Sequence, residues 1–586
     1  MLNKLSFLFI TLIAITTLLI GIYVAVNNSY EFIALYNYTL GPLGDQLYDA
    51  YRVVYPVFTR QESWTQIFIP FADHRVILER VIMLYDMAVN HGIESAHPYR
   101  VIMTFWAAFF VFAFAICRNK NIAHLEKLII LGVAASLFLA HISIANFSTA
   151  ILFTWPMIIL FSFLSFLFLA YYIEAIHHHR YKSSYIYLAC VVLFTTLTIL
   201  SFNIGLWLWP IILLVLYQRR ALKPNIFMWL IVIAVTYYLY LYGGWHPGIT
   251  ADDHGMIKSL YNPIHPFLYF SRTVSIPFVK DAPSSASFAA VMVGLLTTIS
   301  SLYFLYRYWR LRSWSISDTF LFCTLFFSFS TIYIVAVMRS WINAEYAIAG
   351  GRFVAISFVM WTSLLTSYFR FFGTRVFSIA HFRYLFIVCA IAIFHYAGFI
   401  IHSSFDYSLS INKHFIAFST GIPINKAFID FSKNYNNEED IQHHQYADNI
   451  QKQYGLGAYS LWPAKRIGKN IDLAMAKNCN LTGKNMLNTD LRKSGNPAVI
   501  IQSWLPGVKP NKKTFIIYTT KNNKIVGYAL PIADVQRTIK SLITKEPTSS
   551  KWEGAINTDL TKGRLVKSWF VDTHAKTACE YGSLRL

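Results

Sequence analysis

Long apolar runs fill the first 402 residues of this chain, and they exclude most soluble folds. Apolar residues make up 56% of the sequence and charged residues only 13%, against about 45–50% and about 25% in soluble globular domains. Runs of about 20 apolar residues match the thickness of a bilayer. The sequence therefore predicts a polytopic α-helical membrane protein with eleven spans, near 5–26, 101–117, 128–146, 149–173, 184–201, 204–217, 225–243, 286–306, 317–338, 353–369 and 384–402.

The first run, 5–26, also fits the general pattern of a signal peptide, with Lys4 before an apolar stretch. Its apolar stretch of about 20 residues is longer than the 7–15 residues of a signal-peptide core. We therefore expect a retained first helix.

Basic residues mark alternate loops between the predicted spans. The short loops near 147 and 202 carry no Lys or Arg, whereas the other short loops are basic. The positive-inside rule places the basic loops and the amino terminus in the cytoplasm. Eleven crossings then place residues 403–586 on the opposite side. The basic residues are Arg118, Lys120, Lys127, Arg180, Lys182, Arg219, Arg220, Lys223, Arg307, Arg310, Arg312, Arg370, Arg375 and Arg383.

Residues 403–586 have the composition of a polar domain attached to the apolar region 1–402. They hold 25 Lys or Arg and 14 Asp or Glu, a net charge of +11 out of +21 for the chain. Because this domain is tethered to a membrane, we expect anionic lipid, lipopolysaccharide or a phosphate-bearing substrate as its partner, and no nucleic acid.

Short β-prone runs separated by turns predict a small α+β domain, mainly an antiparallel sheet, in this region. We expect strands at 498–501, 515–518, 525–530 and within 564–581, a hairpin turn at 521–524 and a helix at 534–544. Four tryptophans fit either a core or a surface that stacks on sugar rings: Trp462, Trp504, Trp552 and Trp569.

The six cysteines are divided between the apolar region 1–402 and the carboxy-terminal domain. Cys117, Cys190, Cys323 and Cys389 lie in or beside spans and are expected to be small core residues. Cys479 and Cys579 fall in the carboxy-terminal domain, where an oxidising compartment favours a disulfide between them over two free thiols. Such a bridge closes a loop of about 100 residues, worth about 4.7 kcal/mol in the chain-entropy treatment.

The first far-side loop, 27–100, carries the most informative charges. Asp45, Asp49 and Arg52 share one face of a predicted helix at 45–60. Its other face is aromatic, so we expect a helix on the bilayer surface with acids toward water and aromatics toward lipid. A second such helix is predicted at 73–90, with Arg75 and Glu79 four residues apart. The apolar sides are Tyr48, Tyr51, Val54, Tyr55 and Phe58 in the first helix, and Val76, Ile77, Val81, Met83 and Leu84 in the second.

A carboxylate near the headgroup plane can deprotonate an acceptor hydroxyl, and nearby Arg or His can neutralise a phosphate leaving group. The loop therefore suits chemistry on a lipid-linked substrate. Surface helices with solvated charges explain the same spacing equally well.

Two short motifs resemble those of a known enzyme class. Ala72-Asp73-His74-Arg75-Val76 resembles the Asn-Glu-His-Arg-Ile-type motif in the first loop of many bacterial polytopic glycosyltransferases, and Gly351-Arg352-Phe353 resembles their Ser-Arg-Tyr motif. With one amino-terminal span, a long first loop and a far-side carboxy-terminal domain, region 1–402 resembles the GT-C glycosyltransferases. Length and topology are similar to the serotype-converting O-antigen glucosyltransferases of enteric bacteria and their phages. The sequence departs from the pattern in having Asp73 for Glu and Gly44 rather than a second acid before Asp45.

The resemblance implies inverting transfer of a hexose such as glucose from an undecaprenyl-phosphate donor. The acceptor would be the O-antigen of lipopolysaccharide or another lipid-linked glycan, at the periplasmic face of the bacterial inner membrane. Asp45 would be the general base, with Asp73 and Asp49 as alternatives. Arg75, Arg352 and Arg339, with His74, would hold the donor phosphate. A donor-synthesising transferase and a flippase are the implied partners.

Simpler roles account for two of these residues. Asp45 follows Gly44 and fits a helix N-cap, and Arg352 fits an interfacial residue whose charged head reaches water.

The second far-side loop contains a weak candidate for a divalent-cation site of mixed nitrogen and oxygen ligands. Two acids and two histidines in a turn-rich loop also occur by chance, so we predict no metal. These residues are His246, Asp252, Asp253 and His254.

Two other classes of function fit the same chain. A lipid-linked oligosaccharide flippase would place charged residues along a pathway inside the spans, where this sequence has few. A non-enzymatic envelope assembly protein would use the far-side domain for binding.

Overall fold

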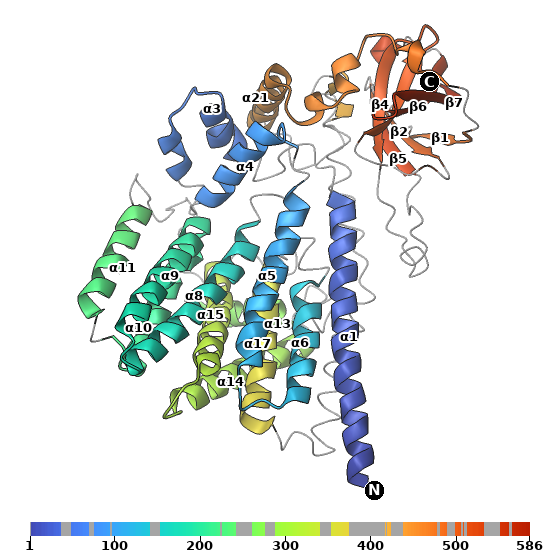
Figure 1. Ribbon diagram of the computed structural model, residues 1–586. Helices are drawn as coiled ribbons and strands as arrows, with labels where there is room; N and C mark the ends of the chain where they lie inside the picture. The colour runs from blue at the N-terminus through green and yellow to red at the C-terminus, as the bar shows by residue number, and fades with distance from the viewer. Residues whose placement is uncertain are drawn as a thin grey trace. The chain divides into compact units, whose positions relative to one another are not determined.

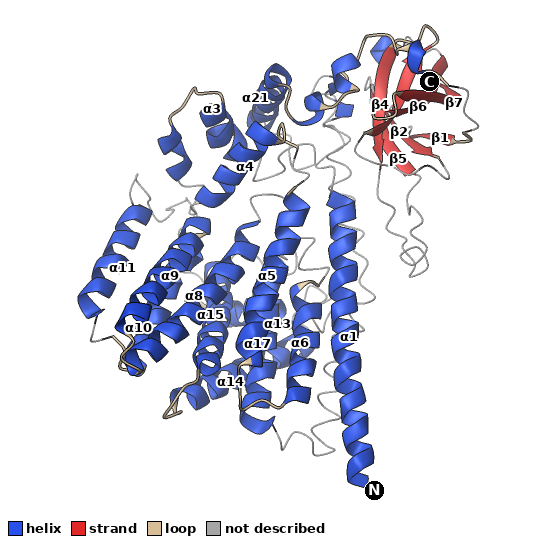
Figure 2. Cartoon of the chain, viewed as in Figure 1, coloured by secondary structure: helices blue, strands red, loops and turns tan. Residues whose placement is uncertain are grey.

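Helices occupy the described part of the chain up to residue 373, and strands occupy the part after residue 483 (Figures 1 and 2). The computed structural model describes residues 2–36, 49–69, 76–93, 96–140, 153–222, 225–241, 261–275, 288–339, 353–373, 416–417, 419–422, 438–477, 481–488, 498–505, 508, 513–531, 551–561 and 565–586.

The main α-helices are α1 (Leu2–Tyr36), α3 (Tyr55–Phe58), α4 (Ile77–Val89), α5 (His97–Cys117), α6 (His124–Phe138), α8 (Thr154–His177), α9 (Tyr181–Ser201), α10 (Leu208–Gln218), α11 (Ile226–Leu241), α13 (Ile264–Ser275), α14 (Phe288–Trp309), α15 (Ile316–Arg339), α17 (Val354–Phe372) and α21 (Glu438–Tyr454). Short 3-10 or π segments are η1 (Ala50–Val54), η2 (Trp64–Phe68), η4 (Asn203–Trp207), η8 (Gly457–Ser460), η9 (Ala464–Arg466), η10 (Leu473–Met475) and η12 (Thr558–Leu560). The strands are β1 (Lys484–Asn488), β2 (Ala498–Trp504), β3 (Thr514–Thr520), β4 (Ile525–Pro531), β5 (Lys551–Asn557), β6 (Leu565–Asp572) and β7 (Thr577–Arg585).

Seven helices in the described residues are long and apolar enough to cross a membrane, which fits a polytopic membrane protein. They match seven of the predicted spans within a few residues. The seven are Thr11–Tyr30 within α1, His97–Cys117, Thr154–His177, Tyr181–Ser201, Phe288–Trp309, Ile316–Arg339 and Val354–Phe372.

The predicted count of eleven spans is not confirmed. Helix α6 has 15 residues, and α10 has 11, about 17 Å of helix against a hydrocarbon core of about 30 Å. The predicted span 204–217 is divided between η4 and α10. This segment and α11 are apolar but shorter than the 18 residues required of a candidate span. The predicted span 384–402 lies outside the described residues.

The chain forms two compact units, which are described separately. The helical unit comprises Met1–Phe32, Ile67–Glu79 and Tyr99–Ile401, and the sheet unit comprises Ile33–Gln66, Arg80–Pro98 and His402–Leu586. Parts of the loop 27–100 therefore belong to the same compact unit as the carboxy-terminal strands.

Basic residues gather at one end of the helical unit. The Arg370 guanidinium donates to both carboxylate oxygens of Asp318, at 2.8 and 3.3 Å, and so ties the end of α17 to the start of α15. Arg307 lies over the ring of Phe371 at 4.9 Å, and Arg219 lies over the ring of Trp314 at 5.2 Å. The basic ends of α10, α14 and α17 thus meet at one end of the bundle, as the alternating loop charges predict. Assigning that end to the cytoplasm stays a prediction.

Two glycines allow α1 and α6 to touch backbone to backbone. A Cβ on Gly21 would lie 2.0 Å from the carbonyl oxygen of Gly132, and one on Gly132 would lie 2.4 Å from the carbonyl oxygen of Thr17. Asn28 Nδ2 donates to the carbonyl of Leu139 at 2.8 Å near the same crossing. Small residues at such contacts are typical of helices packed inside membranes.

Helix α13 lies between the predicted spans 225–243 and 286–306, in a loop for which no helix was predicted. Its 12 residues are too few to cross a bilayer, and it packs against α14, α15 and α17. The Trp361 indole donates to the carbonyl of Val274 at 2.9 Å, and the Phe270 and Phe329 rings are 5.7 Å apart. Arg272, within this helix, is only 4% exposed. The polar sequence of α13 hides it from a search for apolar spans.

The predicted antiparallel sheet is present in the sheet unit (Figure 2). Its seven strands follow the order β1-β2-β5-β4-β3-β6-β7, and every neighbouring pair is antiparallel. The Tyr581 hydroxyl on β7 donates to Asn485 Oδ1 on β1 at 3.0 Å, so the sheet curls until its two edges approach each other. Both faces of the sheet carry buried apolar clusters.

The predicted local details of this region are confirmed in part. Strands cover 498–504, 514–520 and 525–531, and the predicted strand region 564–581 is the hairpin of β6 and β7. The turn at 521–524 is confirmed, while the predicted helix 534–544 lies outside the described residues. Trp552 and Trp569 are buried in the sheet, and Trp462 and Trp504 are half-buried.

Candidate functional site

An open groove of about 250 Å³ lies in the helical unit where η4, the end of α15 and the start of α17 meet. Of the described residues that line it, Asn203 and Arg339 are the two with strongly polar side chains. The apolar lining residues are Phe202, Ile204, Leu206, Trp207, Ile334, Val335, Met338 and Phe353. Its described walls are therefore mostly apolar, with the positive charge of Arg339 beside them.

Aromatic contacts hold these walls in place. The buried ring of Trp155 lies 5.4 Å from Phe202 and 5.2 Å, edge-on, from Phe353. The Trp207 indole donates to the Ser330 hydroxyl at 2.7 Å, which fixes η4 against α15. These contacts are possible because α9 ends at Ser201 and Phe202 adopts an extended conformation, so that the chain turns before η4 begins.

Arg339 is the last residue of α15 and is half-buried. It forms no ion pair with an acidic side chain among the residues that the structure describes. The start of α15, where Asp318 binds Arg370, is at the opposite end of this 24-residue helix, so the groove lies at the end of the bundle away from the clustered arginines. A guanidinium beside apolar walls suits a ligand that joins a phosphate to an apolar chain.

The sequence predicted Arg339 as a phosphate-binding residue, and the groove places it beside apolar residues that the sequence did not single out. The predicted Arg352 directly precedes the lining residue Phe353 but lies outside the described residues. In the sequence, η4 was indicated only by the interruption at 201–205 of the long apolar stretch 184–217.

The predicted first-loop residues Asp45, Asp73, His74 and Arg75 also lie outside the described residues. Asp49, the remaining candidate base, is described and lies in the sheet unit. Its carboxylate accepts hydrogen bonds from Arg80 Nε at 3.0 Å and from Arg80 Nη2 at 2.5 Å.

The expectation that the acids of this helix face water is wrong for Asp49. Asp49 is 1% exposed and Arg80 is fully buried. A buried bidentate pair of this kind occupies the carboxylate, so the arrangement favours a structural role for Asp49.

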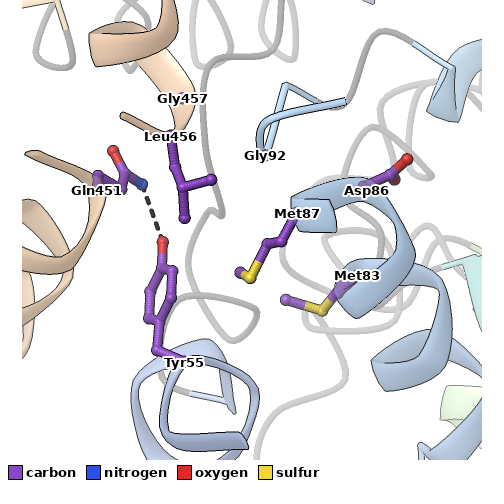
Figure 3. A pocket seen from close by; sticks show the side chains of 8 residues that line it. All are labelled: Tyr55, Met83, Asp86, Met87, Gly92, Gln451, Leu456 and Gly457. Carbon is purple, nitrogen blue, oxygen red and sulfur yellow. Dashed lines mark hydrogen bonds between the residues drawn. The ribbon is translucent and has the colours of Figure 1, made fainter. Parts of the chain in front are cut away.

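The expectation that the aromatic face of this segment meets lipid is also wrong, because the face packs on α21. The rings of Tyr51 and Tyr446 are 4.9 Å apart, and those of Phe58 and Tyr454 are 5.9 Å apart. Gln451 Nε2 donates to the Tyr55 hydroxyl at 2.9 Å (Figure 3). This part of the first loop is thus packed against α21 within the sheet unit.

The cavity beside this contact is too small for a substrate. It has about 10 Å³ of room, enough for about one water molecule. Tyr55 and Gln451 line it with Met83, Asp86 and Met87 of α4 (Figure 3). The residues that line this cavity pack against one another, which indicates that their role is structural.

Burial raises the pKa of Asp448 on α21 from its ordinary value of 3.8, against a hydrogen bond of 2.7 Å from the Tyr459 hydroxyl that lowers it. The folded chain therefore binds this proton more tightly than the unfolded chain. We expect the free energy of unfolding to fall as pH rises from 3.8 through the raised pKa, and to level off above it. Denaturation at a series of pH values measures this slope.

Asp448→Asn keeps the acceptor for Tyr459 and removes the titration, so its stability is expected to lack that slope. Asp472→Asn, at an exposed carboxylate, serves as the control. An unchanged slope in Asp448→Asn would show that other groups cause it.

The metal candidates His246, Asp252, Asp253 and His254 lie outside the described residues. Among the residues that are described, no group of three or more His, Cys, Asp or Glu side chains could hold a metal ion.

Cys579 on β7 is disulfide-bonded, whereas Cys117, Cys190 and Cys323 are free. The backbone N–H of Lys477 donates to the carbonyl of Ala578 at 3.0 Å, which brings the chain two residues before Cys479 beside Cys579. Cys479 lies outside the described residues, so the pairing stays a prediction that this approach supports.

No family model, no curated protein and no solved structure was found to match the sequence.

Proposed function

We propose that the chain is a membrane glycosyltransferase that moves a hexose from an undecaprenyl-phosphate donor to a glycan on the periplasmic face of a bacterial inner membrane. The observation that carries this proposal is the groove of η4, α15 and α17. Its apolar walls suit the isoprenoid chain of a donor, and Arg339 suits the phosphate.

In the proposed reaction an acceptor hydroxyl attacks the anomeric carbon of the donor sugar from the side opposite the phosphate. A carboxylate, with Asp45 as the leading candidate and Asp73 as the next, takes the hydroxyl proton. The bond from the anomeric carbon to the phosphate oxygen breaks, and undecaprenyl phosphate leaves with the electron pair. Arg339, together with Arg352, Arg75 and His74, would stabilise the negative charge of that phosphate. No step in this scheme requires a metal ion.

Arg339→Gln is expected to lower kcat/KM for the donor by about 10- to 100-fold, since a hydrogen bond to a charged group contributes about 1.5–3 kcal/mol. The assay is transfer of labelled hexose by the purified full-length variant at varied donor concentration. Arg310→Gln, which removes an exposed arginine at the basic end of the bundle, is the matched control. Equal donor kinetics in wild type and Arg339→Gln would remove the groove from the proposal.

One observation favours a lipid-linked oligosaccharide flippase as the second candidate. Arg272 is buried in α13 among the helices of the bundle, and buried charges inside membranes often mark a transport pathway.

Mass spectrometry of the host's surface polysaccharide, with and without the gene, separates the candidates. The proposed transferase adds a hexose to each modified glycan unit. Loss of the whole surface polymer on deletion would indicate the flippase, and an unchanged polymer would indicate an assembly protein without enzymatic activity.

A further inference from the structure

Five basic residues from two distant segments meet on the surface of the sheet unit. Lys465, Arg466 and Lys469 lie in and after η9, and Lys521 and Lys524 lie at the turn between β3 and β4. We refer to these five residues as the basic patch.

Backbone hydrogen bonds bring the two segments together. The N–H of Gly468 donates to the carbonyl of Ile525, and the N–H of Ile525 donates to the carbonyl of Lys469, both at 2.9 Å. The N–H of Ile471 donates to the carbonyl of Asn523, also at 2.9 Å. The segment 468–471 is therefore held alongside the β3–β4 turn by backbone hydrogen bonds.

The conformation of that turn fixes where its two lysines lie. The N–H of Thr520 donates to the carbonyl of Lys524 at 2.8 Å, and Asn523 has a φ of 61°. Asparagine tolerates this left-handed conformation better than most residues. The turn holds Lys521 and Lys524 on either side of Asn523, and Lys524 lies over Gly468, with its Cε 3.9 Å from a Cβ placed there.

The positive charge of the patch is not neutralised by ion pairing within the described part of the chain. None of its five side chains forms an ion pair with an acidic residue in the described part of the chain. The nearby carboxylate of Asp472 accepts the backbone N–H of Ala474 at 3.0 Å. All four lysines are exposed.

An aromatic ring lies within the same surface. The Arg466 guanidinium stacks on the ring of half-buried Trp462 at 4.6 Å. Tryptophan beside basic residues is a combination that suits the boundary between water and lipid headgroups.

We infer that the basic patch binds the anionic phospholipid headgroups of a membrane surface. The lysines are separate point charges on an open surface and do not converge on a pocket. That arrangement fits many phosphates spread over a plane better than one phosphate held in a site. The sheet unit thereby acquires an electrostatic attachment to the membrane, a role separate from sugar transfer.

The test uses the full-length protein in nanodiscs of phosphatidylcholine, mixed with sedimentable vesicles. Binding to vesicles of equal parts phosphatidylglycerol and phosphatidylcholine is expected to exceed binding to phosphatidylcholine vesicles and to weaken in high salt. Each cation near an anionic surface strengthens partitioning about fivefold. A variant with all five patch residues changed to Gln is expected to bind more than about 100-fold more weakly.

The matched control removes five exposed cations elsewhere on the same sheet unit. It changes Lys477, Lys484, Lys513, Lys576 and Arg585 to Gln, with the same loss of net charge. Its vesicle binding is expected to fall much less than that of the patch variant.

Three results would overturn the inference. The control variant loses binding as strongly as the patch variant, or wild-type protein binds both kinds of vesicle equally. The third is tight binding of soluble inositol hexakisphosphate at the patch without vesicle binding, which would assign the patch to a soluble phosphate ligand.

Discussion

Asp49→Asn is expected to destabilise the sheet unit by about 3–5 kcal/mol, the usual cost of removing one partner of a buried ion pair. The substitution leaves the Arg80 guanidinium fully buried without the carboxylate that now accepts its bonds at 3.0 and 2.5 Å. Because folded proteins are stable by only about 5–15 kcal/mol, much of the protein is expected to be degraded or unfolded. Chemical denaturation of the purified full-length chain measures the change.

Glu62→Gln is the matched control for Asp49→Asn. Glu62 is exposed, so its substitution is expected to change stability by less than about 0.5 kcal/mol. An Asp49→Asn protein that is as stable as wild type but inactive would mean that Asp49 is a catalytic group and that its pairing with Arg80 is incidental.

Asp45→Asn is expected to abolish sugar transfer while leaving expression and membrane insertion normal. Asparagine keeps the size of aspartate and its ability to cap a helix but cannot take a proton. Loss of a general base costs about 10²–10⁴-fold in rate, whereas loss of a cap costs only about 1 kcal/mol of stability. Transfer of labelled hexose by the purified variant, beside its denaturation midpoint, distinguishes the two roles.

Near wild-type transfer by Asp45→Asn would exclude Asp45 as the base, and Asp73→Asn then becomes the decisive variant. Asp49 is the weaker alternative, since Arg80 already occupies its carboxylate.

The sequence predicted those features that depend on neighbouring residues. Seven of the spans follow from runs of apolar residues, and the turn at Lys521–Lys524 follows from its Asn-Asn centre between two β-prone runs. The clustering of Arg307, Arg219 and Arg370 at one end of the bundle follows from the alternation of basic loops.

Features that depend on residues far apart in the chain were missed or misinterpreted. The aromatic stripe of 51–58 matched a lipid-facing helix because its partner, α21, begins about 380 residues later. Asp49 matched a solvated acid because its partner Arg80 is 31 residues away.

The groove could not be predicted, because it is formed by three segments that no local sequence pattern connects. These segments, 202–207, 334–339 and Phe353, meet only in the folded bundle. The sequence analysis named Arg339 as a phosphate-binding residue, but its apolar neighbours were indistinguishable from ordinary span residues. Helix α13 was missed because its polar residues, among them Ser271 and Arg272, lower its hydropathy although they are buried.

The most direct test of the proposed function follows a labelled hexose on undecaprenyl phosphate in vesicles that contain the purified full-length chain and an acceptor glycan. The proposal predicts that the label moves to the glycan and that one undecaprenyl phosphate is released for each hexose transferred. Label that stays on the lipid while the lipid crosses from one leaflet to the other would contradict it and would establish a flippase.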